Sequence, residues 1–524
     1  MGIPSFYRRL SIGHKGLIGK DRGQKTAALY FDFNCLIYTV VRSPAMPPYS
    51  ASSHKEWEAI LYNEICKYIL LVWTYAGSPS EVFLSIDGVV PLAKIKQQRL
   101  RRFKSAWLVK EELSRGIRTP GDSWDTNAIT PGTAFMDGLG QKLQDFCKQR
   151  GKGWSVSTAS EPGEGEQKIM QRLRNRTPES FDGSLLIYGL DADLILLTLL
   201  NGVGKGFQHC YLMREDKEMG KPELQNEFSF FSMNKLPELL WRDFASLSFD
   251  QKLSRIQNYV CGMSLLGNDF LPHSLSIHVR DDGHEILSRD LVSFEKEGKA
   301  LLQKGDDGLL TLNQECLREL LSNWSQQEEN TILQMIRKKQ SFKHQTNQVD
   351  AEQVLQALPL EWDVEREVVL YKKNDEGKYR IEFLPRWKQV YHEKWLKGHS
   401  IQDLTRHYVY GVQWVFDYYT GQRPIPNTWM YPCSLPPLWS ELISHLPLNA
   451  NDTTIAYQEI QPQQQLSMVL PLSSWYLIRD KKYRSLPFDY PQYFPRLFSF
   501  YSVGKRHLWE CEPDICHLPL FLIA

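Results

Sequence analysis

The sequence predicts an α/β protein built on a parallel β-sheet with helices on both faces. Over about the first 300 residues, short β-branched or aromatic segments alternate with longer helical patterns, which is the order that parallel sheets require. Three of the five expected strands run directly into an acidic residue. Beyond residue 345 the chain becomes rich in aromatic residues and proline. We expect that part to form a second, mixed α/β region packed against the first.

The expected strands are segments 28–33, 81–87, 154–159, 184–190 and 209–213. Segment 55–73 lies between the first two and carries apolar residues at helical spacing, namely Trp57, Leu61, Ile65, Tyr68 and Val72. Charged residues interrupt this segment, so it predicts a core helix and not a membrane span. The polar segment 337–353 is a candidate linker or exposed helix end. It suggests a division into residues 1–345 and 346–524.

The overall composition excludes several classes of protein. Lys plus Arg number 62 and Asp plus Glu number 61, so bulk charge identifies no partner. The nine cysteines include no C-x-x-C pair, which favours a reduced, intracellular protein without structural zinc. The first residues carry no apolar signal segment, and Phe6 stands where a myristoylation motif needs Ser or Thr. We therefore expect neither a signal peptide nor an acyl anchor.

Acidic residues follow the expected strands. Asp32 ends the first strand, Asp87 the second, and Asp191 with Asp193 follow the fourth. A single Asp at a strand end is more often a helix N-cap than a ligand. Four together are harder to explain as caps, because the carboxyl ends of parallel strands converge on one site.

Three further carboxylates complete the set. Glu164 and Glu166 lie in "PGEGE", and Asp269 follows an apolar helical segment in "LLGNDFLP". Seven carboxylates cannot lie close together near neutral pH without cations. Hard oxygen ligands suit Mg²⁺ or Mn²⁺, and the number of carboxylates suggests two ions, the arrangement that hydrolyses phosphodiesters.

A basic helix is expected directly after Asp87. In "PLAKIKQQRLRRFK" the residues Lys94, Gln98, Arg101 and Arg102 share one helical face, and Pro91 is well placed to open the helix. For an arbitrary helix such a face is simply solvated. Next to a metal site it predicts a pocket for a terminal phosphate monoester.

These segments, in this order, resemble the XRN family of 5′→3′ exoribonucleases. The matching motifs are "MGIPSFYRRL", "FDFN", "IDGVVPLAKIKQQRLRRF", "NAITPGTAFM", "PGEGEQKIM", "YGLDADLILL" and "LLGNDFLPH". Weaker similarity continues through "GVQWVFDYY", "WMYP" and "QQQLSMVLPLSS". The resemblance implies a PIN-like, 5′-nuclease fold, with residues 1–345 as the catalytic region and residues 346–524 bracing the active site and lining an RNA channel.

Site residues carry over from the family at matching positions. The resemblance implies that the metal ligands and catalytic residues are Asp32, Asp87, Glu164, Glu166, Asp191, Asp193 and Asp269. It implies a pocket for a 5′-monophosphate at Lys94, Gln98, Arg101 and Arg102. Tyr38 stands where the family has a His that stacks on the 5′-terminal base, and Trp429 is the candidate for the opposing stack.

The chain departs from the family pattern at several positions. Gln167 replaces a His and cannot titrate, and Asn427 replaces the first tryptophan of the family's Trp-x-Trp. Both changes leave the roles of those positions open. His273 and His278 lie near Asp269 in sequence, and we expect them to pack or be solvated and not to bind metal.

The implied function is processive 5′→3′ degradation of single-stranded RNA that bears a 5′-monophosphate, yielding 5′-mononucleotides by two-metal hydrolysis. The implied enzyme is a compact, cytoplasmic-type member without a C-terminal extension, a monomer, not bound to membranes, and linked in function to a decapping enzyme. Two alternatives stay open. One is a flap-endonuclease-like DNA 5′ nuclease, although no helix-hairpin-helix pattern follows Asp269. The other is a non-catalytic RNA-binding scaffold derived from a nuclease.

Overall fold

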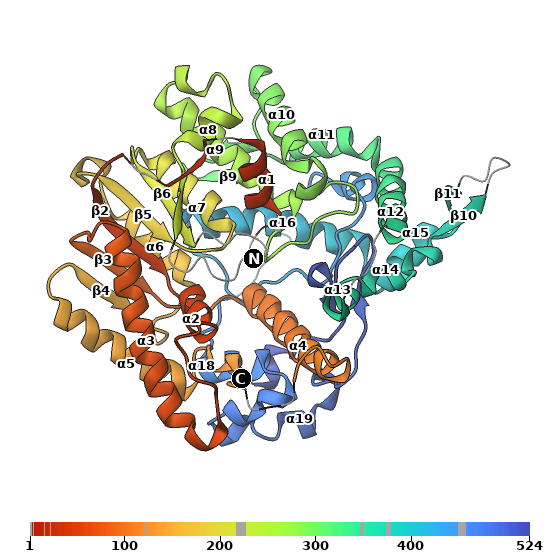
Figure 1. Ribbon diagram of the computed structural model, residues 1–524. Coiled ribbons are helices and arrows are strands. Elements are labelled where there is room, and N and C mark those ends of the chain that lie inside the picture. The colour runs from red at the N-terminus through yellow and green to blue at the C-terminus, as the bar shows by residue number, and fades with distance from the viewer. Residues whose placement is uncertain are drawn as a thin grey trace.

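A computed structural model of the chain contains one large sheet and a surrounding set of helices (Figure 1). It describes residues 3, 5–14, 16–20, 23–119, 121, 123–215, 227–345, 350–373, 379–448 and 457–523.

Seven of the described strands form the central sheet, in the order β1-β7-β6-β5-β2-β3-β4. The strands are β1 Ile18–Gly19, β2 Thr26–Asp32, β3 Glu81–Ser85, β4 Trp154–Ser157, β5 Ser184–Tyr188, β6 Cys210–Glu215 and β7 Phe228–Ser232. The five strands from β6 to β4 pair in parallel, whereas β7 pairs antiparallel with β6, and β1 antiparallel with β7. The carboxyl ends of β2, β3 and β5 therefore meet at one edge of the sheet.

The five strands expected from the sequence all form, with ends that differ by a few residues. The sequence interpretation missed β1 and β7, which extend the parallel sheet at one side with antiparallel strands. The sequence "FSFFS" of β7 is rich in aromatic residues, which favour strands, but it does not alternate strictly, because Phe230 and Phe231 are adjacent.

The first region contains a series of helices, some of which cover the two faces of the sheet. They are α1 Phe6–Gly13, α2 Asn34–Val41, α3 His54–Tyr75, α4 Leu92–Ser114, α5 Ala134–Arg150, α6 Gly165–Arg174, α7 Asp193–Asn201, α8 Lys235–Leu240, α9 Phe249–Met263, α10 Gly283–Lys296, α11 Gln314–Ser325 and α12 Glu328–Gln345. Helices α2, α3 and α5 pack on one face, and α6, α7 and α9 on the other (Figure 1). The expected helix over 55–73 lies within α3, where four of its five stripe residues are buried.

Alternation along the strands builds these two cores. In β2, Ala28 and Tyr30 belong to the core under α6 and α7, whereas Leu29 and Phe31 belong to the core under α2 and α3. All four side chains are fully buried. Because successive strand residues point to opposite faces, a strand covered on both sides has to be apolar along its whole length. The charged residues are consequently confined to the strand ends.

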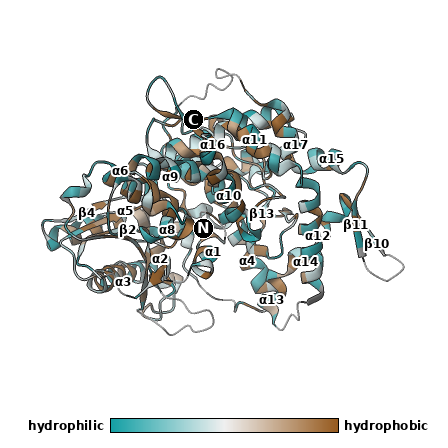
Figure 2. Ribbon diagram, turned by 90° about the horizontal axis from the view of Figure 1, so that it is seen from above, coloured by the Kyte–Doolittle hydropathy of each residue, from teal (hydrophilic) through white to brown (hydrophobic). Residues whose placement is uncertain are grey.

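The second region consists of short elements and one long helix. The helices are α13 Ala351–Gln356, α14 Leu358–Glu361, α15 Trp387–Val390, α16 Ile401–Thr420, α17 Trp439–Leu442, α18 Pro462–Val469 and α19 Leu486–Asp489. Its two-stranded pairs are β10 Val369–Lys373 with β11 Tyr379–Phe383, and β12 Phe500–Tyr501 with β13 Glu512–Pro513. A further pair, β8 Leu302–Lys304 with β9 Leu310–Leu312, lies in the first region. The β10–β11 hairpin projects from the side of the molecule away from β4 (Figure 2).

The two regions share their cores. The largest apolar cluster contains residues of α6, α7 and α9 together with residues of α16, and a third cluster joins α4 to α18 and the C-terminal segments. The boundary expected near residue 345 stays a prediction. Helix α12 ends at Gln345, and residues 346–349 of the expected linker lie outside the described residues.

Among the described residues, no helix has both the length and the apolar character needed to cross a membrane. All nine cysteines are free thiols.

Candidate active site

The sheet and two loops bring the seven predicted carboxylates to one place. Asp32 is the last residue of β2, Asp87 follows β3 by two residues, and Asp191 with Asp193 lie where the chain passes from β5 into α7. The other three come from the start of α6 and from the loop after α9; they are Glu164, Glu166 and Asp269.

Their mutual repulsion shows how close they lie. Burial, and then the charges of Asp87, Asp191 and Asp193, raise the pKa of Asp32 well above its usual value. Burial followed by repulsion from Asp193 and Glu164 does the same to Glu166. Burial, with Asp191 as the largest neighbouring charge, raises the pKa of Asp193 to about 7. This cluster is therefore short of positive charge.

Glycine is required between the two glutamates. A Cβ added to Gly165 would lie 2.6 Å from the carbonyl oxygen of Ser85 and 3.0 Å from Oδ1 of Asp32. No side chain fits there without a shift of the backbone, because real Cβ contacts are longer. Glu164 and Glu166 are 3% and 4% exposed, and Glu164 makes no side-chain cap to α6. A solubilising or capping turn does not explain them.

Asp87 is held by hydrogen bonds from two elements. The Nδ2 of Asn34 in α2 donates to its Oδ2 at 2.9 Å, and the backbone N–H of Gly165 donates to its Oδ1 at 2.6 Å. Asp87 thus also caps the first turn of α6, so the simpler N-cap interpretation is partly right for this residue. The sequence interpretation gave Asn34 no role, although it lies in the motif "FDFN".

Lys94 lies among the carboxylates. Its Nζ is 2.5 Å from Oε2 of Glu164 and 2.8 Å from Oδ2 of Asp269. Although burial disfavours the ammonium charge, Asp269 and Glu164 hold the pKa of Lys94 well above its usual value. The other oxygen of Glu164 accepts a hydrogen bond from the hydroxyl of Tyr418 in α16, at 2.7 Å. The sequence interpretation missed Tyr418, whose segment matched the family without indicating a role.

The chemistry of the cluster fits a hard divalent cation. One oxygen of Glu166, Oε1, is buried and accepts no hydrogen bond from the described residues. Within the described part of the chain, however, no three Asp, Glu, His or Cys side chains already have the geometry to hold a metal ion. Lys94 gives a physical reason, since its ammonium bridges Glu164 and Asp269. The donor set fits Mg²⁺ or Mn²⁺ by its oxygen atoms and its excess charge.

The predicted phosphate residues have separate environments along α4. Oε1 of Gln98 accepts a hydrogen bond from Gln465 at 3.3 Å, and Arg102 donates to Oδ1 of Asn127 at 2.9 Å. Arg101 is exposed and makes no hydrogen bond or salt bridge with the described residues. Burial lowers the pKa of Arg102, while the nearby Tyr38 and Asp87 oppose this effect. The structure therefore brings Arg102, Tyr38 and the carboxylate cluster close together.

Trp429 requires a correction. It is 1% exposed and its ring packs on Trp414, with ring centroids 4.9 Å apart. A Cβ on Gly411 would lie 2.5 Å from its Cζ2, so the ring fills a space that only glycine leaves open. Trp429 is a core residue in this structure and presents no face for a base. By contrast, Tyr38, in the middle of α2, is half-buried.

The structure also describes Gln167 and Asn427, the positions at which the chain departs from the family pattern. Nε2 of Gln167 is buried and finds no hydrogen-bond acceptor among the described residues. Asn427 lies at the start of α4, where its carbonyl oxygen accepts the N–H of Leu92 at 2.7 Å. His273 and His278 interact elsewhere: His273 with Ser274 and Lys505, and His278 with Asp281.

The fold and the site together define a class of protein. In this class a parallel sheet brings carboxylates together at the carboxyl ends of its strands, and divalent metals bound there carry out phosphodiester chemistry. Comparison with known proteins gives the particular family. Residues 1–216 match the family model described as the XRN 5′-3′ exonuclease N-terminus. This match places residues 1–216 in the XRN family.

Curated relatives support the same assignment. The chain is 32% identical over 405 residues, 63% of its length, to 5′-3′ exoribonuclease 2 of Debaryomyces hansenii. It is 26% identical over 578 aligned residues, 97% of its length, to human 5′-3′ exoribonuclease 1. It is 34% identical over 314 residues, half of its length, to 5′-3′ exoribonuclease 2 of Schizosaccharomyces pombe. The matched parts make up 38%, 33% and 31% of those relatives, so the chain spans about a third of their length.

Proposed function

We propose that this protein is a 5′→3′ exoribonuclease that degrades single-stranded RNA bearing a 5′-monophosphate and releases 5′-mononucleotides. One observation carries the proposal: seven carboxylates converge beside the basic helix α4 in a chain similar to the XRN family, and burial with mutual repulsion raises the pKa of Asp32 and Glu166 among them. Relatives of the chain are named 5′-3′ exoribonucleases.

The metal requirement follows from the site. The seven carboxylates Asp32, Asp87, Glu164, Glu166, Asp191, Asp193 and Asp269 would hold two Mg²⁺ or Mn²⁺ ions. When bound, such ions supply an activated water and stabilise the leaving 3′ oxygen. The surrounding residues orient the ligands: Asn34 and the N–H of Gly165 fix Asp87, and Tyr418 fixes Glu164.

Substrate recognition belongs to α4 and α2. Lys94, Gln98, Arg101 and Arg102 would bind the 5′-phosphate, because a phosphate monoester accepts several charge-assisted hydrogen bonds. A cap or a triphosphate would place extra bulk in a pocket bounded by the interactions of Gln98 and Arg102. Tyr38, beside Arg102, offers a ring on which any base can stack. A monomeric state, a cytoplasmic role and a functional link to a decapping enzyme stay predictions from the family resemblance.

The test uses one internally labelled single-stranded RNA with a 5′-monophosphate, a 5′-triphosphate or a 5′-hydroxyl end. We expect mononucleotide release from the monophosphate RNA in Mg²⁺, and none in EDTA or with Asp191→Ala. Equal degradation of all three ends would contradict the phosphate pocket. Cleavage of DNA flaps in preference to RNA would favour the DNA nuclease alternative, and binding without cleavage would favour the scaffold alternative.

A further inference from the structure

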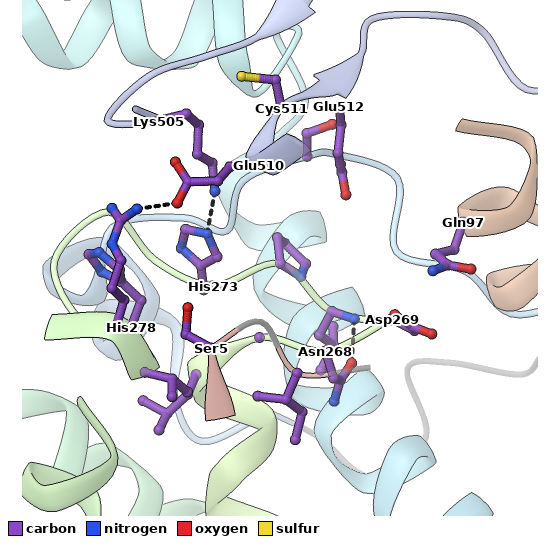
Figure 3. A pocket seen from close by; sticks show the side chains of 18 of the residues that line it. Ser5, Gln97, Asn268, Asp269, His273, His278, Lys505, Glu510, Cys511 and Glu512 are labelled. Atoms are coloured by element: carbon purple, nitrogen blue, oxygen red, sulfur yellow. Dashed lines mark hydrogen bonds and ion pairs between the residues drawn. The ribbon is translucent and has the colours of Figure 1, made fainter. Parts of the chain in front are cut away.

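A cavity of about 500 Å³ lies beside α4 (Figure 3), and one of the four predicted phosphate residues, Arg101, lines it. Its walls come from α1, from α4, from the loop after α9 and from the C-terminal segment around β12 and β13. Its volume is within the range of small-molecule sites. The cavity does not contain the side chains of Lys94, Gln98 or Arg102, but it does include Asp269.

The cavity adjoins the carboxylate cluster. Besides Asp269, it is lined by Leu190 and Ala192, which flank Asp191 in the loop after β5. Arg101 lines it as well, so this space adjoins the predicted 5′-phosphate pocket along α4. A molecule leaving the carboxylate cluster on this side would enter the cavity.

The lining favours an anion. Of the described residues that form it, seven are Lys or Arg and three are Asp or Glu, which leaves an excess of four positive charges. Arg8 is exposed and lines the cavity, and its guanidinium makes no hydrogen bond or salt bridge within the described part of the chain. Such a cation can pair with a phosphate without losing an internal partner.

One polar atom in the wall lacks a partner among the described residues, and one buried cation there is paired with a neutral group. Oε1 of Gln97 is buried and receives no hydrogen bond from the described residues. The ammonium of Lys505 lies 2.5 Å from Nε2 of His273 and has no salt bridge to a carboxylate within the described part of the chain (Figure 3). Burial lowers the pKa of His273 and that of Lys505. A buried acceptor without a partner favours a polar ligand over an empty apolar space.

The wall also offers aromatic surface. Phe270, Tyr501 and Trp509 line the cavity, and Trp509 is 49% exposed. Aromatic rings beside cations are the combination that binds a base together with its phosphate.

We infer that this cavity binds a nucleoside 5′-monophosphate, the compound that the proposed reaction releases. The inference deepens the proposed function and depends on it for the source of the ligand. The binding itself depends only on the cavity, so it is testable without RNA hydrolysis.

The experiment is calorimetric titration of AMP, with adenosine as comparator, into the full chain in EDTA. The cavity variants are Arg8→Gln and Gln97→Leu. Arg102→Gln probes the 5′-phosphate pocket, and Arg496→Gln is a matched control, because Arg496 is also exposed and lies outside the cavity. We expect each cavity variant to weaken AMP binding about five- to tenfold, the loss of one charge-assisted or buried hydrogen bond. Adenosine should bind at least tenfold more weakly than AMP.

The variants separate the outcomes. If AMP binds in the cavity, Arg102→Gln and Arg496→Gln bind it nearly as well as the native chain. Loss of binding in Arg102→Gln, with native binding in both cavity variants, would overturn the inference and assign AMP to the 5′-phosphate pocket. Absence of AMP binding in the native chain would also overturn it, even if RNA is degraded. AMP binding without RNA degradation would contradict the proposed function alone.

Discussion

At the scale of single residues, the site depends on groups that orient carboxylates. Glu164 is held between Lys94 and Tyr418, one on each carboxylate oxygen. Tyr418 comes from α16 in the second region, so a residue more than 200 positions away in sequence fixes a predicted metal ligand. Removing a hydrogen-bond partner that orients a metal ligand typically lowers metal affinity or activity about 10- to 100-fold.

Tyr418→Phe tests this positioning. It removes the hydroxyl that Glu164 accepts from and leaves the ring in place, so we expect Mn²⁺ affinity and kcat to fall about 10- to 100-fold. Calorimetric Mn²⁺ titration measures the first effect and RNA turnover the second. Tyr419→Phe is the matched control, because the hydroxyl of Tyr419 is buried without a partner among the described residues. Equal losses in both variants would show that the effect is one of packing.

Gly165→Ala tests the close approach in "PGEGE". The added methyl group would meet Ser85 O and Asp32 Oδ1, which forces the start of α6 away from the sheet. We expect a loss of about 1–3 kcal/mol in unfolding free energy, measured by urea denaturation, together with at least a 100-fold loss of nuclease activity. Gly13→Ala is the control, because nothing lies within 4 Å of the new Cβ. Native activity of Gly165→Ala would contradict the crowding.

At the scale of elements, the sequence predicted the core of the fold better than its edges. Apolar strands that run into Asp32 and Asp87 are visible in the sequence, because a strand covered on both faces can carry charge only at its ends. The burial of Trp429 was not readable, since it depends on Gly411 and Trp414 in another element. Tyr418 was missed for the same reason: its partner is distant in sequence.

Helix α4 illustrates a second limit of sequence interpretation. Some of its charged residues belong to the predicted phosphate pocket, whereas others are buried against the second region. Composition does not distinguish these two roles. Arg99 is 1% exposed, and its guanidinium donates to the carbonyl oxygens of Met468 at 2.7 Å, Cys516 at 3.1 Å and Tyr493. These bonds fasten the basic helix to the second region.

Arg99→Met tests whether these bonds brace α4. The substitution leaves the carbonyl oxygens of Met468, Cys516 and Tyr493 without this donor, so we expect the unfolding free energy to fall by about 2–4 kcal/mol in urea denaturation. Lys110→Met on the exposed side of the same helix is the control and should change it by less than about 0.5 kcal/mol. A similar small change for both variants would mean that α4 does not depend on this contact.

At the scale of the whole molecule, the carboxylate cluster links metal binding to stability. Folding brings together buried carboxylates whose pKa values are raised, among them Asp32 and Glu166. A bound divalent cation would relieve that repulsion only in the folded state.

We therefore expect saturating Mn²⁺ to raise the Tm by about 2 °C or more, as followed by circular dichroism. Asp32→Asn should abolish the rise and leave the metal-free Tm at or above that of the native chain, because it removes one of the repelling groups. Asp250→Asn, at the exposed start of α9, should keep the full rise. If Mn²⁺ does not change the Tm of the native chain, the proposed metal site is contradicted.

The direction of degradation tests the central claim most directly. A single-stranded RNA with a 5′-monophosphate carries one label on its first nucleotide and a different label on its last, and both are followed in Mg²⁺ over time. The account predicts that the first label appears as a mononucleotide at the earliest time, and that the last label follows after a delay that grows with RNA length. Release of the last label first, or early internal fragments, would contradict it.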